Sequence, residues 1–220
     1  MNTTELESPR QVAWERVFGP AIQAASHAMS VWTQGRVTLS LDEVRELPLV
    51  ELGSAVESAQ DTATVVVLGV IGEVSGQFLV TVDDEGAAAL AALLLNRPPR
   101  PFADWGEIER SALMETGNIL GSAYLSALTK MTGLRLFPTP PEMLRDYLVC
   151  ILEHAAMMQA MESDYVLLAR TCFRHQNECV NWNMLFVPSP ELLNLLRDIA
   201  AQPMLAIPES SIADCQRSEI

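Results

Sequence analysis

The sequence predicts an α+β domain in which one order of elements occurs twice. Each half of the chain carries a long helical pattern with an apolar side, a short strand, two β-rich runs joined by a turn, and a shorter helix. Between the halves lies a proline-rich connector at residues 97–101, which cannot be helical. With 49% hydrophobic residues, a chain of 220 residues can bury a substantial core.

The first half is expected to span about residues 12–96. Its long helix runs from about Val12 to Gln34, with Trp32 on the apolar side, and a strand follows at residues 36–41. The segment 44–56 around Pro48 predicts a short helix or an irregular strand. The runs 63–71 and 76–82 predict a hairpin. The acidic residues 83–85 then favour the start of a helix that continues to Leu95.

The second half, about residues 104–202, repeats this order. We expect a long helix from about Trp105 to Met131, ending at Gly133, and a short strand at residues 134–137. A second helix is predicted from Pro140 to about Met161, then a hairpin from the runs 165–173 and 178–187, and a last helix at residues 190–200. Residues 1–203 are therefore predicted to form a single domain, and residues 204–220 a flexible tail.

Two hairpins of this kind are best satisfied by pairing into one continuous antiparallel sheet, with the two long helices packed on one face. This makes the two halves an internal duplication. The predicted fold is therefore a duplicated α+β layer structure.

Composition excludes several classes of function. The net charge of −14 and the pI near 4.5 disfavour nucleic-acid partners and anionic membrane surfaces. The longest apolar runs, 65–71 and 87–95, are shorter than the roughly 20 residues that a membrane span requires. The N-terminus has no apolar signal region, and four cysteines in a chain of this length do not suggest a disulfide framework. We expect a cytoplasmic protein with reduced cysteines.

A metal site is not expected. Cys172, His175 and Cys179 lie close together in sequence, but they have no fourth ligand at a recognised spacing. A buried structural role accounts for them better. His27 and His154 each stand alone on predicted helices and are interpreted in the same way. No hydrolase or nucleotide-binding motif occurs in the chain.

The second long helix carries an unusual polar stripe. Ser111, Glu115 and Asn118 occupy positions i, i+4 and i+7 on one side of this helix, and Ser122, Ser126 and Thr129 continue the same line. A solvated helix face usually carries long charged side chains, whereas this one has short side chains around one carboxylate and one carboxamide. Such a surface suits close approach by another protein.

The spacing of Ser111, Glu115 and Asn118, followed by Pro140, resembles the signature of the CheC/CheX/FliY phosphatases of bacterial chemotaxis. The flanking words GNILGSAYLSALTKMTGL and PTPPEML are similar to CheC. The resemblance implies a CheC-like domain with two helices related by a pseudo-two-fold axis and backed by a continuous sheet. It also implies a phosphatase that acts on phosphorylated CheY.

The same resemblance implies a role for each site residue. Asn118 would orient the attacking water, and Glu115 would dock on the active-site lysine of the response regulator. Both roles are compatible with the chemistry of the side chains, because a carboxamide both donates and accepts hydrogen bonds and a carboxylate pairs with a cation. Ser111 and Pro140 complete the motif. Mg2+ would belong to the phosphorylated CheY-like partner, so this chain would bind no cofactor.

The first half departs from the pattern. Aligning it with the family places Arg16 at the position of the glutamate and Gly19 at that of the asparagine. Arginine offers no acceptor and glycine has no side chain, and Pro20 is expected to interrupt the hydrogen bonding of the helix or to move its start. We therefore predict a single intact site, in the second half.

Three alternatives remain open at this point. Glu115 and Asn118 could be purely structural, the first favouring the helix dipole and the second forming a buried hydrogen bond. The chain could be a non-catalytic CheC-like adaptor that binds CheD or the flagellar switch. A small-molecule hydrolase is a third alternative, but no nucleophile and base pair is recognisable.

Overall fold

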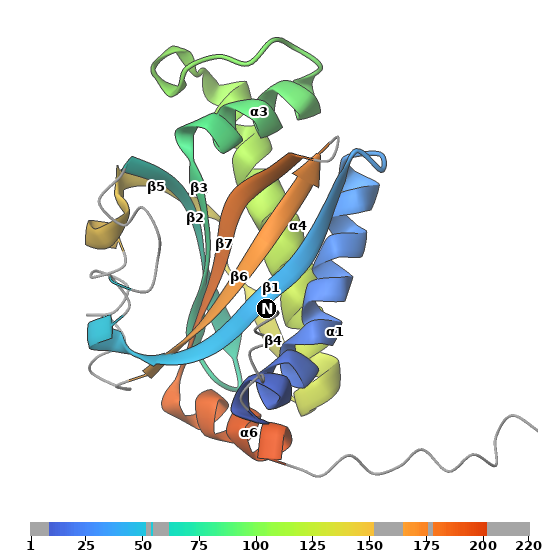
Figure 1. Cartoon of the computed structure of the whole chain (residues 1–220), viewed down its shortest axis with the longest axis vertical. Helices are drawn as coiled ribbons and strands as arrows, with labels where there is room; N and C mark the ends of the chain where they lie inside the picture. Colours follow the sequence, from blue (N-terminus) through green and yellow to red (C-terminus); the bar gives the residue numbers. More distant parts are fainter. Residues whose placement is uncertain (1–8, 52–53, 55–61, 152–164, 176–177, 202–220) are drawn as a thin grey trace, which may run out of the picture.

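The computed structural model describes residues 9–51, 54, 62–151, 165–175 and 178–201. In this part of the chain a single antiparallel sheet carries two long helices side by side on one face, and two shorter helices lie at its opposite ends (Figure 1). The predicted layer arrangement of helices on one antiparallel sheet is confirmed.

The first half follows the predicted order. Its elements are α1 (Pro9–Trp32), β1 (Val37–Pro48), the 3-10 turn η1 (Leu49–Glu51), β2 (Thr62–Gly72), β3 (Gly76–Asp83) and α3 (Asp84–Leu95). The predicted helix start at residues 83–85 is confirmed, because the Asp83 carboxylate accepts a hydrogen bond of 2.6 Å from the backbone N–H of Gly86.

The second half contains one element that the sequence analysis assigned wrongly. Its elements are η2 (Phe102–Asp104), α4 (Glu107–Thr132), β4 (Leu136–Pro138), β5 (Glu142–Tyr147), β6 (Tyr165–His175), β7 (Glu178–Pro188) and α6 (Pro190–Ala201). The segment after Pro140 begins as strand β5 rather than as a helix, and helical structure starts only at residue 148. The pairing of β5 with β2 outweighs the helix-start signal of two prolines and a glutamate.

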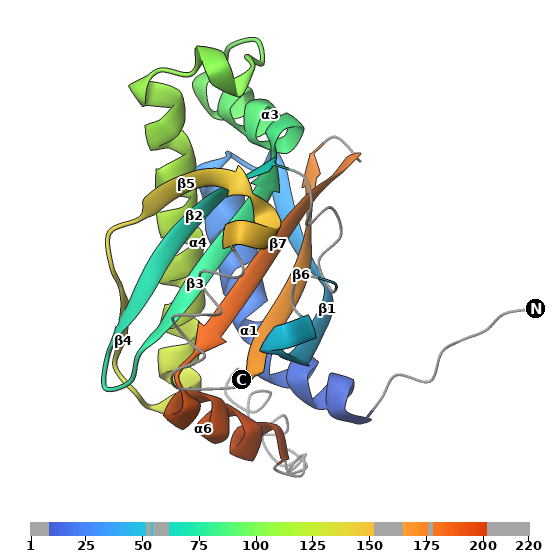
Figure 2. The same ribbon diagram turned by 90° about the vertical axis from the view of Figure 1, so that its left-hand side faces the viewer.

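The order of strands in the sheet is itself symmetric. The path runs β1-β6-β7-β3-β2-β4, with β5 also paired to β2 (Figure 2). The hairpins β2–β3 and β6–β7 meet at the centre through β3 and β7. Each outer strand then belongs to the opposite half, with β1 beside β6 and β4 and β5 beside β2. The two halves are therefore interlocked in one sheet.

The interrupted edge formed by β4 and β5 corresponds to the continuous edge strand β1. A proline has no N–H for the ladder, so the strand breaks at residues 139–141. Thr139 bridges the break, because its N–H donates to Gly69 O and its hydroxyl accepts from Gly69 N–H, both at 2.8 Å. In β1 the same region has only a shift of register between Leu41 and Glu43. β1 therefore extends well beyond the predicted strand at residues 36–41.

Most of the core lies between the long helices and the sheet. Its centre is an aromatic group in which Tyr124 of α4 contacts Phe78, Phe186 and Phe18, with ring centroids 5.0, 5.6 and 5.9 Å apart respectively. Aromatic pairs of this kind contribute about 0.5–1.5 kcal/mol each beyond their buried area. This group holds α1 and α4 against the same strands.

The cysteines differ in one respect from the expectation. Cys172 on β6 is buried and disulfide-bonded, so the expectation that all four cysteines are reduced is wrong at this position. Cys150 is a free thiol. Within the described part of the chain, no helix is both long enough and apolar enough to span a membrane.

Candidate active site

Helix α4 carries the predicted site, and both of its ends are well defined. At its start, the N–H of Gly106 donates to the Glu109 carboxylate at 3.0 Å. At its end, Gly133 adopts the left-handed conformation with φ 76°, and its N–H bonds to Thr129 O. The predicted limits of this helix are confirmed to within two residues.

The polar stripe lies at the surface of α4. Ser111, Glu115 and Ser126 are exposed, and Asn118 and Ser122 are half-buried. Within the described part of the chain, the side chains of Glu115 and Asn118 form no hydrogen bond and no ion pair. This does not agree with the alternative in which Asn118 is a buried hydrogen-bonder. The carboxylate and the carboxamide are therefore both available to an approaching molecule.

Two glycines let the opposite face of α4 lie close against the sheet. A Cβ atom at Gly117 would fall 2.4 Å from Cγ1 of Val66, and one at Gly121 would fall 3.2 Å from Leu68. Any larger side chain at Gly117 would push the helix away from β2. Gly117 directly precedes Asn118, so this close contact fixes the backbone that carries the candidate site.

A contact that the sequence analysis missed connects the site to the end of α1. The indole Nε1 of Trp32 donates to Thr116 Oγ1 at 3.1 Å, and that hydroxyl donates in turn to Ala112 O at 2.8 Å. Thr116 is buried and follows Glu115 directly. The sequence places Trp32 only on the apolar side of its helix, and 84 positions separate it from Thr116. No local pattern could have indicated this pair.

The motif residues fall at two places. Ser111 and Glu115 line a hollow of about 440 Å³ together with Trp32, Arg36 and Ile108. Pro140 lies apart from this hollow, in the exposed turn between β4 and β5. The chain near that turn is tied to the stripe, because Leu136 N–H donates to Thr129 Oγ1 at 3.2 Å. Thr129 therefore has a structural role.

The structure gives an internal register for the two halves. Thr33 and Thr132 lie 99 positions apart, and each donates its hydroxyl to the carbonyl four residues earlier at 2.8 Å. The next residues, Gln34 and Gly133, both adopt the left-handed conformation, with φ 56° and 76°. The same offset places Arg16 opposite Glu115 and Gly19 opposite Asn118, in agreement with the register from the sequence.

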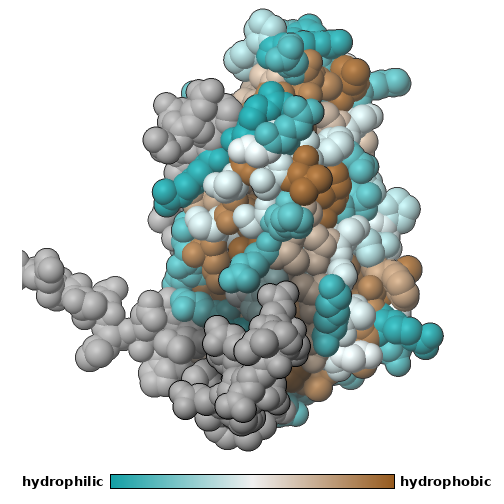
Figure 3. All heavy atoms as spheres, turned by 90° about the vertical axis from the view of Figure 1, so that its right-hand side faces the viewer, coloured by the Kyte–Doolittle hydropathy of each residue, from teal (hydrophilic) through white to brown (hydrophobic). Residues whose placement is uncertain are grey.

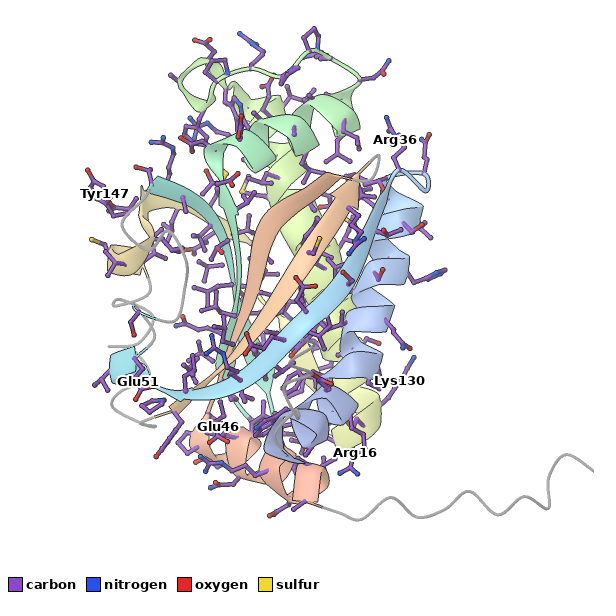
Figure 4. All side chains as sticks on the ribbon, viewed as in Figure 1. Arg16, Arg36, Glu46, Glu51, Lys130 and Tyr147 are labelled. Carbon is purple, nitrogen blue, oxygen red and sulfur yellow. The ribbon has the colours of Figure 1, made fainter. Side chains whose placement is uncertain are left out.

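Arg16 has a structural role at its position. Its Nη2 donates to the carbonyls of Ala200 and Ile199 in the last turn of α6. These carbonyls have no partner within their helix and carry the negative end of its dipole, so a guanidinium stabilises them. In Figure 4, Arg16 lies at the end of the molecule next to α6, and Arg36 lies at the opposite end.

Gly19 explains how α1 passes through a proline. The helix continues from Pro9 to Trp32 with Pro20 inside it, so Pro20 neither ends the helix nor shifts its start. A residue before proline is normally disfavoured in a helix because its Cβ crowds the proline ring, and glycine has no Cβ. Around Gly19, a hollow of about 460 Å³ stands where a side chain would project.

The structure also locates the candidate metal ligands. His27 is exposed on α1, and His154 lies outside the described residues. Cys172 is in a disulfide, while the side chains of His175 and Cys179 fall outside those described. Among the described residues, no group of three or more histidines, cysteines or acidic residues lies close enough to hold a metal ion.

Comparison with known proteins points to one group. Residues 108–145, which contain all four motif positions, match the CheC-like family. The chain is 25% identical over 162 residues to the CheY-P phosphatase CheC of Bacillus subtilis, a match covering 70% of this chain and 78% of that protein.

Solved structures share the fold. FliY of Thermotoga maritima superposes with a TM-score of 0.69 at 14% identity, covering 90% of this chain and 98% of that one. A chain of the CheX-CheY-BeF3-Mg2+ complex of Borrelia burgdorferi superposes with a TM-score of 0.53 at 16% identity, covering 78% of this chain and 96% of that one.

Proposed function

We propose that this chain, which is similar to CheC over residues 108–145 and shares the fold of FliY and CheX, hydrolyses the aspartyl phosphate of a CheY-like response regulator through one site on α4. The observation that carries the proposal is that the side chains of Glu115 and Asn118 are accessible and have no partner among the described residues. Both lie on an accessible stripe inside the family-matched segment, and neither is engaged by another described residue.

Each residue has one task in this proposal. The carboxamide of Asn118 orients a water molecule opposite the leaving carboxylate of the phosphorylated aspartate. The water oxygen bonds to phosphorus, the bond to the aspartate oxygen breaks, and inorganic phosphate leaves. Alignment of the water supplies most of the acceleration, because phosphoryl transfer depends chiefly on positioning and charge stabilisation.

Glu115 fixes the approach of the partner. Its exposed carboxylate pairs with a lysine of the regulator and so places Asn118 over the phosphoryl group. The short serines of the stripe allow the loops of the regulator to come close to the helix. Mg2+ is bound by the regulator together with the aspartyl phosphate, so this chain supplies no metal ligand.

The decisive experiment measures phosphate loss from a purified phosphorylated CheY-like regulator, with the parent protein and with Asn118→Ala. The parent should accelerate the loss, and the variant should reduce the acceleration by about a hundredfold or more while remaining folded, because Asn118 is outside the core. Ser126→Ala, on the same stripe and exposed, is the matched control. Turnover by Asn118→Ala at the parent rate would exclude the proposed site.

Glu115→Ala separates docking from chemistry. It should weaken binding of the regulator activated with beryllofluoride and Mg2+, as well as turnover. If the parent binds the activated regulator but does not dephosphorylate it, the chain is the adaptor considered above.

A further inference from the structure

The hollow beside Glu115 is bounded by three different helices. Trp32 comes from the end of α1, Leu94 and Leu95 from the end of α3, and Ile108 and Glu115 from the first turns of α4. The face that carries α1 is drawn in Figure 3, where apolar side chains gather in its upper part among polar ones. Two large apolar side chains of the hollow are exposed, Trp32 at 37% and Ile108 at 50%.

The side chains at the centre of this hollow are apolar. The only polar atom of the Trp32 side chain is satisfied by Thr116, so the ring itself is left for apolar contact. Leu94, Leu95 and Ile108 add aliphatic surface around it. Charged groups stand at its rim, the Glu115 carboxylate and the Arg36 guanidinium, whose Nε donates to Thr33 O at 3.0 Å.

We propose that this groove, defined by Trp32, Leu94, Leu95 and Ile108, receives an apolar side chain that the response regulator presents beside its phosphorylation site. The proposal rests on the proposed function and deepens it, because it assigns an affinity-determining surface to the same partner.

Two observations favour this occupant. Glu115 is both a docking residue of the proposed site and a lining residue of the groove, so a partner that pairs with Glu115 lies directly beside the groove. The residues that contribute most to the affinity of a protein–protein interface usually insert into an apolar pocket with a polar rim. The inserted side chain supplies affinity, and the charged groups at the rim fix the orientation of the partner.

In the first half, the position equivalent to this groove wall carries no carboxylate. At the position of Glu115 stands Arg16, whose guanidinium is bound to carbonyls of α6. The carboxylate at the rim of the groove thus comes from α4, the helix with the intact motif.

The test uses Ile108→Ser, Trp32→Ala and Trp32→Phe in the full chain, with turnover measured over a range of phosphorylated regulator. Ile108→Ser and Trp32→Ala should raise KM by about tenfold with kcat unchanged, because the anchor contributes binding and takes no part in chemistry. Trp32→Phe keeps an apolar ring without the N–H and should recover most of the affinity. Val31→Ser is the matched control, since Val31 is 67% exposed and does not line the groove.

The outcomes separate this proposal from the proposed function. If Asn118→Ala is inactive but Ile108→Ser and Trp32→Ala keep the parent KM, the groove proposal is wrong and the phosphatase stands. If the parent shows no turnover, the phosphatase proposal fails, and binding of the regulator activated with beryllofluoride and Mg2+ decides on the groove. Weaker binding by both variants then supports the groove, and unchanged binding excludes it.

Discussion

Arg16 and Glu115 occupy equivalent positions with opposite charges, and of the two only the arginine side chain has a partner among the described residues. The guanidinium binds the last carbonyls of α6, where a positive charge is favourable. We predict that Arg16→Ala lowers the free energy of unfolding by about 0.5–1 kcal/mol and leaves turnover per molecule unchanged. Urea unfolding and the phosphate-release assay measure the two effects, with Arg16→Lys retaining part of the stability. A large loss of turnover in a folded Arg16→Ala variant would mean that α1 takes part in catalysis.

Glu109 makes the start of α4 sensitive to acid. Hydrogen bonds from its own N–H and from that of Gly106, together with Arg100 and Arg97, lower the pKa of the Glu109 carboxyl, although burial opposes this. The two guanidiniums lie 3.7 and 3.9 Å from its Oε1. A lowered pKa in the folded state means that the stabilisation is complete above the ordinary pKa of glutamate and is lost as pH falls through the folded value.

We therefore predict that Glu109→Gln is less stable than the parent at pH 7 and that the difference narrows as the pH is lowered toward 3. Urea midpoints at a series of pH values measure this difference. Glu107→Gln, an exposed charge in the same turn, serves as the control and should show a smaller difference at every pH. A Glu109→Gln difference that is independent of pH would rule out the charged state as the source of the stabilisation.

At the scale of elements, the contact between α4 and β2 determines how the site is held. Gly117→Ala places a methyl group against Val66, whose branched side chain cannot move aside easily. We predict a loss of about 1–3 kcal/mol, despite a gain in helix propensity of about 1 kcal/mol. A Cβ at Gly121 would lie 3.2 Å from Leu68 and 3.3 Å from Phe78, a much milder overlap, so Gly121→Ala should cost less. Unfolding midpoints compare the two, and equal effects would indicate that α4 can shift on the sheet.

Sequence periodicity predicted most elements because their apolar positions face the core that they help to form. It failed at residues 142–147, where a strand follows two prolines that resemble a helix start. Four successive side chains of β5, from Leu144 to Tyr147, are exposed, so its own pattern contains no strand signal. Its conformation comes from pairing with β2, which is a tertiary effect. The pair Trp32–Thr116 escaped prediction for the same reason.

At the scale of the whole molecule, the duplication gives two similar halves and one candidate site. The stripe, its helix and its limits could be predicted because they depend on spacing within one segment. The surroundings of Glu115 could not, since they come from the ends of α1 and α3. The lack of the motif asparagine at position 19 has a local cause, because a side chain there would crowd Pro20 within the helix.

We accordingly predict that each chain binds one response regulator. Titration calorimetry with a regulator activated by beryllofluoride and Mg2+ should give a stoichiometry of one. The double variant Arg16→Glu/Gly19→Asn should not raise it, because a side chain at position 19 would crowd Pro20 and loss of the guanidinium would free the α6 carbonyls. The activated form should bind more tightly than the unmodified regulator, since a ligand that selects one state must have a differential affinity for it. A stoichiometry of two for the parent chain would show that the first half retains a binding surface without the carboxylate and the carboxamide.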